Sequence, residues 1–124
     1  MSGPSLVLDT NIVQYLLNGD DELEHLLQGT TVFVSVITKI ELLSRPGLDT
    51  EGEAIVRDLL DQAKVMEFSS VIQERTIVLR RKHRIKLPDA VIAATAAFLN
   101  AQLVTADVRF AKLKDDIELL LIER

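Results

Sequence analysis

The sequence contains no cysteine or tryptophan, and it has few aromatic, glycine and proline residues. Its 124 residues include 5 Gly and 3 Pro, and the aromatic fraction is 4%. The absence of cysteine excludes disulfides, zinc–thiolate sites and thiol nucleophiles. The two histidines, His25 and His83, stand in charged, helix-like stretches without a metal-binding spacing, so we interpret them as surface helix residues. A metal bound by this chain would therefore be held by oxygen atoms.

Long apolar runs and a basic charge balance are also missing. No stretch approaches the roughly 20 apolar residues that a membrane span needs. The first residues, MSGPSLVLD, lack the basic and apolar regions of a signal peptide. We therefore expect a soluble, cytoplasmic protein with no membrane partner. The formal net charge of −5 argues against a general nucleic-acid coat protein, and the few aromatic residues offer few platforms for base stacking.

Short apolar segments alternate with amphipathic ones along the whole chain. Strands are predicted at 5–9, 31–35, 65–69, 101–107 and 117–123. Helices are predicted at 11–19, 20–29, 36–45, 50–64, 70–84, 87–100 and 108–113. Strands separated by helices predict a three-layer α/β fold, with a central, mostly parallel sheet of four to five strands and helices on both faces. We expect one domain over residues 1–124.

Two of the predicted helices differ in their pattern of apolar residues. In the helix at 50–64, Ile55, Leu59 and Ala63 recur on one face, as in an amphipathic helix. The helix at 87–100 has Pro88 in its first turn and is apolar on nearly all sides. We therefore expect the helix at 87–100 to be central and buried.

Four acids occupy positions where a parallel sheet places its ligands, outside the carboxyl ends of the strands. Asp9 ends the first predicted strand and Asp107 ends the fourth. Asp89 opens the buried helix, and Glu41 lies about one and a half helical turns beyond the second strand. We expect these four carboxylates, from four distant segments, to meet at one edge of the sheet.

Each acid also has a simpler interpretation. Asp9 and Asp107 are compatible with turn or helix-cap residues, and Asp89 with a favourable charge at a helix N-terminus. Glu41 is harder to explain, because its neighbours are apolar and glutamate is rarely buried without a partner. Two carboxylates ~6 Å apart repel by about 3 kcal/mol at an effective dielectric of ~20. A cluster of four therefore indicates shared protons or a divalent cation, and oxygen ligands favour Mg²⁺ or Mn²⁺.

Four segments, in order, resemble the motifs of PIN-domain ribonucleases, and most of all the small VapC-type toxins of toxin–antitoxin pairs. The segments are LVLDTNIVQYLL, VSVITKIELL, LPDAVIAATA and LVTADVRFAKL, and they span nearly the whole chain. The resemblance implies an endoribonuclease that depends on Mg²⁺ or Mn²⁺, cleaves structured RNA, is inhibited by a cognate antitoxin and often forms a homodimer. The number of metal ions and the choice among tRNA, rRNA and mRNA stay open. Two alternatives also stay open: a PIN-fold RNA-processing nuclease outside a toxin pair, and a catalytically silent PIN-like binding module.

The resemblance also assigns roles to individual residues. The catalytic, metal-binding acids would be Asp9, Glu41, Asp89 and Asp107. Thr10 and Asn11 would orient Asp9 by hydrogen bonds, and Thr105 matches a hydroxyl residue two positions before the last acid. Two nearby acids are alternatives to Asp107 as the fourth acid: Asp115 and Asp116.

A basic stretch, RRKHRIK at residues 80–86, directly precedes Asp89. It is compatible with phosphate binding and equally with a solvated helix end, where cations complement the helix dipole. The candidate RNA-contacting residues are Lys39, Arg81, Arg84 and Lys86.

Overall fold

A computed structural model describes residues 3–124 and contains a five-stranded sheet in which every pairing is parallel. The strand order is β3-β2-β1-β4-β5, so the first strand is central. The predicted fold class is confirmed. The strands are β1 (Ser5–Leu8), β2 (Thr31–Ser35), β3 (Lys64–Met66), β4 (Gln102–Thr105) and β5 (Glu118–Leu121).

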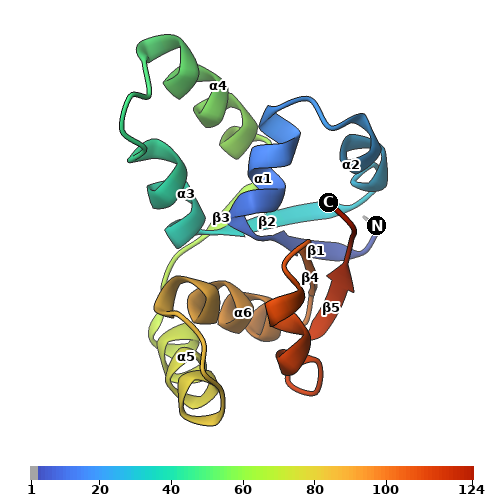
Figure 1. Ribbon diagram of the computed structural model, residues 1–124, viewed down its shortest axis with the longest axis vertical. Helices are drawn as coiled ribbons and strands as arrows, with labels where there is room; N and C mark the ends of the chain where they lie inside the picture. The colour runs from blue at the N-terminus through green and yellow to red at the C-terminus, as the bar shows by residue number, and fades with distance from the viewer. Residues whose placement is uncertain (1–2) are drawn as a thin grey trace.

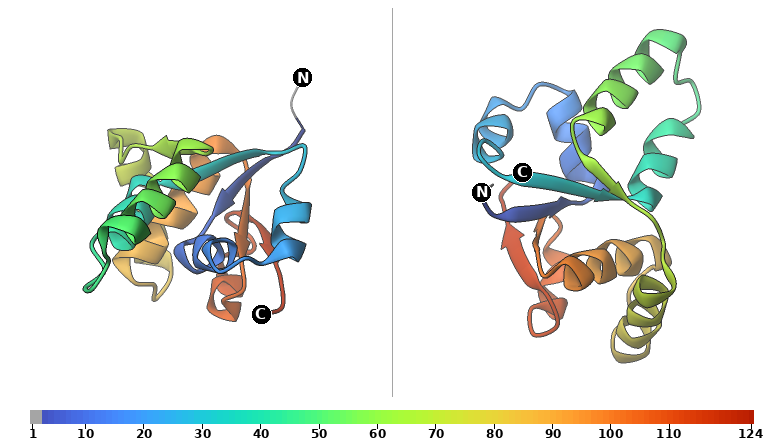
Figure 2. Two further views of the ribbon diagram at one scale, coloured as in Figure 1. Left: turned by 90° about the horizontal axis from the view of Figure 1, so that it is seen from above. Right: turned by 180° about the vertical axis from the view of Figure 1, so that it is seen from behind.

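Helices cover both faces of this sheet (Figures 1 and 2). One group (α1, α2 and α4) lies on one face, and the other (α5, α6 and the 3₁₀ helix η1) lies on the opposite face. α3 follows β2 directly and contributes Ile37 to one core and Leu42 to the other. The helices are α1 (Thr10–Leu17), α2 (Asp21–Leu26), α3 (Val36–Leu43), α4 (Thr50–Asp61), α5 (Ser70–Lys82), α6 (Leu87–Leu99) and η1 (Val108–Leu113).

The central strand divides its side chains between two hydrophobic cores. Val7 packs with the α5, α6 and η1 layer, whereas Leu6 and Leu8 pack with the layer of α1, α2 and α4. This alternation follows from the period of two along a strand. As expected, α6 is central, since every residue from Ala90 to Ala96 is buried. Both faces of β1 are therefore covered, and only its carboxyl end is left for a site.

Register places the ends of β1 and β4 side by side. Leu8 pairs with Val104, and the backbone N–H of Asp9 donates to the Val104 carbonyl at 3.2 Å. The chain turns out of β1 directly into α1, whose C-terminal end is followed, as predicted, by Gly19 with φ +86°. The residues after β1 and after β4 are therefore neighbours at one edge of the sheet.

Most elements are a few residues shorter than the sequence predicts. The strand β4, for example, is Gln102–Thr105 rather than 101–107, so Asp107 lies two residues beyond its end. Two further details differ. The third strand is Lys64–Met66 rather than 65–69, because Ser69 caps α5 and leaves Phe68 outside the sheet. The buried face of α4 carries Val56 and Leu60, whereas Ile55 is 52% exposed. Within residues 3–124, every helix is too short or too polar to cross a membrane.

Candidate active site

Asp9 is the most deeply buried of the four predicted acids, with 4% of its surface exposed. It is the N-cap of α1: its Oδ1 accepts a hydrogen bond from the backbone N–H of Ile12 at 2.9 Å. Its Oδ2 accepts a hydrogen bond from the Thr105 hydroxyl, which arrives from β4. The cap and ligand interpretations are therefore compatible, because one carboxylate oxygen caps the helix while the other faces β4.

Thr105 connects two of the acids. Its hydroxyl donates to Asp9 and accepts from the backbone N–H of Asp107 at 3.0 Å, and its side chain is fully buried. The expectation that Thr10 and Asn11 orient Asp9 is wrong. Within residues 3–124 neither side chain bonds to Asp9, and Asn11 is exposed. Thr105 and the α1 backbone hold Asp9 instead.

Thr10 holds a different acid, Glu41 of α3. The Thr10 hydroxyl donates to Glu41 Oε1 at 2.6 Å and lies 3.0 Å from the hydroxyl of the buried Thr38. Because the single hydroxyl hydrogen of Thr10 is used on Glu41, Thr38 is the donor in the second bond. This chain of bonds fixes Oε1 of Glu41 and leaves Oε2 available to a ligand.

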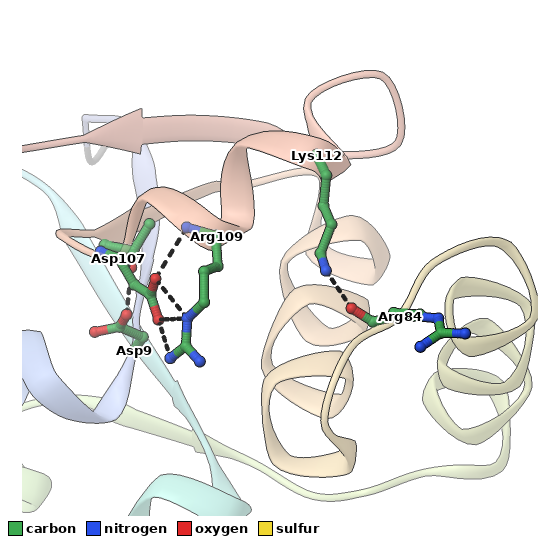
Figure 3. Close-up of polar contacts among 6 residues, drawn as sticks. Asp9, Arg84, Asp107, Arg109 and Lys112 are labelled. Carbon is green, nitrogen blue, oxygen red and sulfur yellow. Dashed lines mark hydrogen bonds and ion pairs between the residues drawn. The ribbon is translucent and has the colours of Figure 1, made fainter.

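Asp107 is held by a cation from its own segment (Figure 3). Arg109 Nη2 approaches Asp107 Oδ2 at 2.6 Å, and Arg109 Nε approaches both carboxylate oxygens at 3.0 and 3.1 Å. The backbone N–H of Arg109 adds a further bond of 2.9 Å, which makes Asp107 the N-cap of η1. The Arg109 guanidinium keeps the pKa of Asp107 below its usual range. This pairing was not predicted from the sequence.

The pKa values of the other two Asp carboxylates move in the opposite direction. Burial raises the pKa of Asp9, and the nearby charges of Asp89 and Asp107 add to the rise, against the hydrogen bonds from Thr105 and Ile12. Burial also raises the pKa of Asp89; Arg109 opposes that rise, and Asp107 and Glu41 reinforce it. The charges of Asp89 and Asp107 therefore act on Asp9, and the charges of Asp107 and Glu41 act on Asp89.

The donor set fits a divalent cation in its chemistry. All four groups are carboxylates, and the pKa values of Asp9 and Asp89 are raised in part by neighbouring negative charge, which a cation would neutralise. Within residues 3–124, however, no three Asp, Glu or His side chains already form a ligand set. Arg109 engages both oxygens of Asp107, and Thr10 engages one oxygen of Glu41. Asp107 could therefore join a ligand set only after Arg109 releases it, whereas Oε2 of Glu41 is already available.

The alternative fourth acids lie elsewhere. Asp116 pairs with Lys82 at 2.5 Å and with His83 at 2.8 Å, which lowers the pKa of Asp116. Asp115 is exposed and lines a surface hollow together with Asp116. Of the three acids considered for the fourth position, Asp107 is the one that the structure places beside Asp9 and Asp89. His25 is exposed, as expected.

A basic cavity of about 390 Å³ adjoins the acids on the α5–α6 side. It contains Asp89 and the predicted Arg84 and Lys86, whereas Arg81 lines the next hollow and Lys39 lines neither. Arg80 belongs to the basic stretch found in the sequence, but the sequence prediction missed Arg109 and Lys112, which follow Asp107 within ADVRFAKL. The full lining is Arg80, Arg84, Ile85, Lys86, Asp89, Arg109, Phe110 and Lys112.

This combination of acids at the carboxyl ends of parallel strands matches a known family. The PIN domain family model matches residues 6–116. The chain belongs to the PIN domain family. The resemblance drawn from the four motifs is confirmed, and the five-stranded parallel sheet is the PIN fold.

Solved structures of similar fold include several toxin–antitoxin complexes. A toxin–antitoxin complex from Klebsiella pneumoniae aligns with a TM-score of 0.82 and 28% identity, over 96% of this chain and 99% of that one. VapBC2 from Rickettsia felis, bound to a DNA fragment from their promoter, aligns with a TM-score of 0.82 and 24% identity, over 96% and 99%. VapBC-5 from Mycobacterium tuberculosis aligns with a TM-score of 0.67 and 23% identity, over 98% of this chain and 100% of that one. The predicted VapC-type PIN fold is confirmed; a comparison with curated proteins gives no match.

Proposed function

We propose that this PIN domain is a divalent-metal-dependent endoribonuclease and the toxin of a toxin–antitoxin pair. One observation carries the proposal: Asp9, Asp89 and Asp107 converge at the carboxyl edge of the sheet, directly beside a cavity lined by cations. Carboxylates suit a metal ion, and cations suit a phosphodiester backbone. A single nuclease domain over residues 1–124 is part of the proposal.

The side chains divide the work of phosphodiester hydrolysis between them. Lys86 and Arg109 line the cavity that contains Asp89, where they would bind the phosphate and stabilise the charge that develops on it. Glu41 Oε2, which the bond from Thr10 leaves available, would accept a proton from the attacking water. Thr105 keeps Asp9 in position by donating to its Oδ2. No serine, cysteine or histidine nucleophile is required.

The cation would be Mg²⁺ or Mn²⁺. Asp9 and Asp89 would be its principal ligands, with Glu41 completing the set and Asp107 positioning water or a second ion. When bound, such an ion acidifies a water molecule and polarises the phosphate. Asp107 becomes available only after Arg109 releases it, because Arg109 engages both of its oxygens.

The biological setting follows from the relatives. Structures of similar fold are toxin–antitoxin complexes, and one of them includes a promoter DNA fragment. We therefore assign this chain a cognate antitoxin partner, a cytoplasmic site of action and an RNA substrate. A homodimer is the proposed assembly.

The decisive experiment is a cleavage assay on structured RNAs with the wild-type protein and with Asp9→Asn. The wild type should cleave with Mg²⁺ or Mn²⁺ and stop when EDTA is added. Asp9→Asn should reduce cleavage by about 100-fold or more, since it removes a principal ligand and charge. Asp58→Asn, the same change at an exposed aspartate of α4 on the opposite face of the sheet from the cavity, serves as the matched control and should cleave normally. Cleavage that survives both EDTA and Asp9→Asn would disprove the proposal.

A further inference from the structure

We propose that the RNA strand leaves the acidic site through a second hollow, between α5 and the start of α6, and stacks a base on Phe68. This inference rests on the proposed ribonuclease function and adds the path of the substrate. The second hollow is about 690 Å³ and adjoins the basic cavity, because Arg80, Arg84 and Ile85 line both. We call these two adjoining hollows together the channel; Asp89 lines the inner hollow and Phe68 lines the outer one.

Charge along this channel is almost entirely positive, although the chain carries a formal charge of −5. Within residues 3–124, Asp89 is the one carboxylate that lines either hollow. Of the 14 Lys and Arg residues, six line the channel. These six are Arg80, Arg81, Arg84, Lys86, Arg109 and Lys112.

Several of these cations are available to a ligand. The side chains of Arg81, Arg84 and Lys86 have no hydrogen bond or ion pair within the part of the chain that the structure describes, and all three are exposed. The Lys112 ammonium donates to the Arg84 carbonyl and thereby fixes the wall between the two hollows (Figure 3). An unpaired row of cations beside a phosphodiester-cleaving site fits the next phosphates of the same strand.

The outer hollow also has an apolar floor, which phosphate binding alone does not explain. Phe68, Ile77 and Leu87 line it with 39%, 43% and 49% of their surfaces exposed. Phe68 is exposed because β3 ends at Met66 and Ser69 already caps α5. An aromatic ring beside a row of cations is the combination that binds single-stranded nucleic acid, with the base on the ring and the phosphates on the cations. Paired bases of a duplex are not free to stack there.

The test measures RNA binding in EDTA, where cleavage does not interfere. The probe is a fluorescein-labelled single-stranded RNA of about 12 nucleotides, close to the size of a single-strand site, read by fluorescence anisotropy. Phe68→Ala should weaken binding about tenfold. Arg81→Gln should weaken it about threefold and reduce the slope of log Kd against log salt by about 0.7. A duplex of the same sequence should bind wild type and Phe68→Ala equally.

Matched controls come from the opposite sides of the same helices. Arg75 is an exposed arginine of α5 that lines a different hollow, and Phe98 of α6 is 40% exposed outside the channel. Arg75→Gln and Phe98→Ala should bind RNA like the wild type. Wild-type affinity in both channel variants, as expected if an acidic protein segment occupies the hollow, would overturn the proposal. Equal weakening by the controls would also overturn it.

Failure of this inference can be told apart from failure of the ribonuclease proposal. If the wild type cleaves RNA but Arg81→Gln and Phe68→Ala bind RNA with unaltered affinity, the proposed path is wrong and the ribonuclease proposal stands. If the wild type does not cleave RNA but the variants show the expected loss of binding, the proposed path stands and the ribonuclease proposal is wrong. Arg81→Gln and Arg75→Gln should melt like the wild type, because both side chains are exposed. Phe68→Ala and Phe98→Ala should lower the melting temperature by similar amounts, because the two rings are 39% and 40% exposed and lose similar buried surface.

Discussion

Asp9 and Asp107 lie just beyond the carboxyl ends of two neighbouring strands, Asp9 directly after β1 and Asp107 two residues after β4. Each follows a parallel strand, each caps the helix that comes next, and the two strands are neighbours in the sheet. Their surroundings are nevertheless opposite. Asp9 is buried against Thr105, with its pKa raised by burial, whereas the more exposed Asp107 is paired with Arg109, with its pKa lowered.

The difference shows that the backbone determines the position of each acid, whereas the neighbouring side chains determine the direction in which its pKa moves. Asp9 lies at the centre of the sheet edge, where a cation would relieve the most unfavourable charge. Asp107 already has a cation, which must leave before a metal ion can use it. Thr105 joins the two, because one hydroxyl donates to Asp9 and accepts from the Asp107 backbone.

The largest expected effect on stability comes from breaking that link. Thr105→Val removes the donor to Asp9 and the acceptor for the Asp107 N–H, and leaves polar groups unsatisfied in a buried place. We expect the free energy of unfolding to fall by about 2 kcal/mol, measured by urea denaturation, and cleavage to fall with it. Thr105→Ser keeps the hydroxyl and should recover most of both. Equal stability of the Val and Ser variants would show that the link contributes nothing.

A smaller effect concerns the charge of Asp89. In EDTA at pH 7, Asp89→Asn should raise the melting temperature by a few degrees, because the folded state disfavours the ionised Asp89. Its raised pKa means that the folded chain binds more protons than the unfolded chain between the elevated value and the ordinary 3.8. Stability of the wild type should therefore rise as the pH falls through that window, and the two melting temperatures should converge near its lower end.

Metal and further acidification provide the controls for that prediction. Adding Mg²⁺ at pH 7 should raise the melting temperature of the wild type more than that of Asp89→Asn. Below pH 3.8 the trend should reverse, because acids with lowered pKa values, such as Asp107 and Asp116, lose their stabilising pairs on protonation. Melting temperatures that are independent of pH, metal and substitution would contradict the clustered-acid interpretation.

The smallest expected effect is that of Arg109→Gln. Removing the guanidinium frees both oxygens of Asp107 and should tighten Mn²⁺ binding about threefold, as measured by isothermal titration calorimetry. The melting temperature without metal should hardly change, because Arg109 is mostly exposed. Lys112→Gln is the matched control, since that cation lines the same cavity but bonds to a carbonyl. Weaker Mn²⁺ binding by Arg109→Gln would show that Arg109 assists the metal.

The sequence was sufficient for features that depend on the backbone. The order of strands and helices could be predicted from the spacing of apolar residues and from residues that end or begin helices, such as Gly19 and Pro88. Both kinds of signal depend only on nearby residues. The convergence of the acids followed from topology, since parallel strands bring their carboxyl ends to one edge.

Features that depend on side-chain direction were beyond the sequence. The bond of Thr10 to Glu41 links residues 31 positions apart, and nothing local distinguishes Glu41 from Asp9 as its partner. The pairing of Arg109 with Asp107 depends on how tightly η1 turns. The buried face of α4 carries Val56 and Leu60, one residue along from the predicted Ile55 and Leu59. The helix has apolar residues on two adjacent faces, and its packing against the sheet decides which face is buried.

The order of the strands has a consequence for when activity arises during synthesis. Asp9 is synthesised before Thr105, which holds it and follows 96 residues later. At ~5–20 residues per second, the ribosome takes roughly 5–20 s to make the intervening segment. Until β4 emerges and pairs with β1, the two strand ends that carry Asp9 and Asp107 are not side by side. The edge of the sheet that carries Asp9 and Asp107 is therefore assembled only after the segment between β1 and β4 has been synthesised.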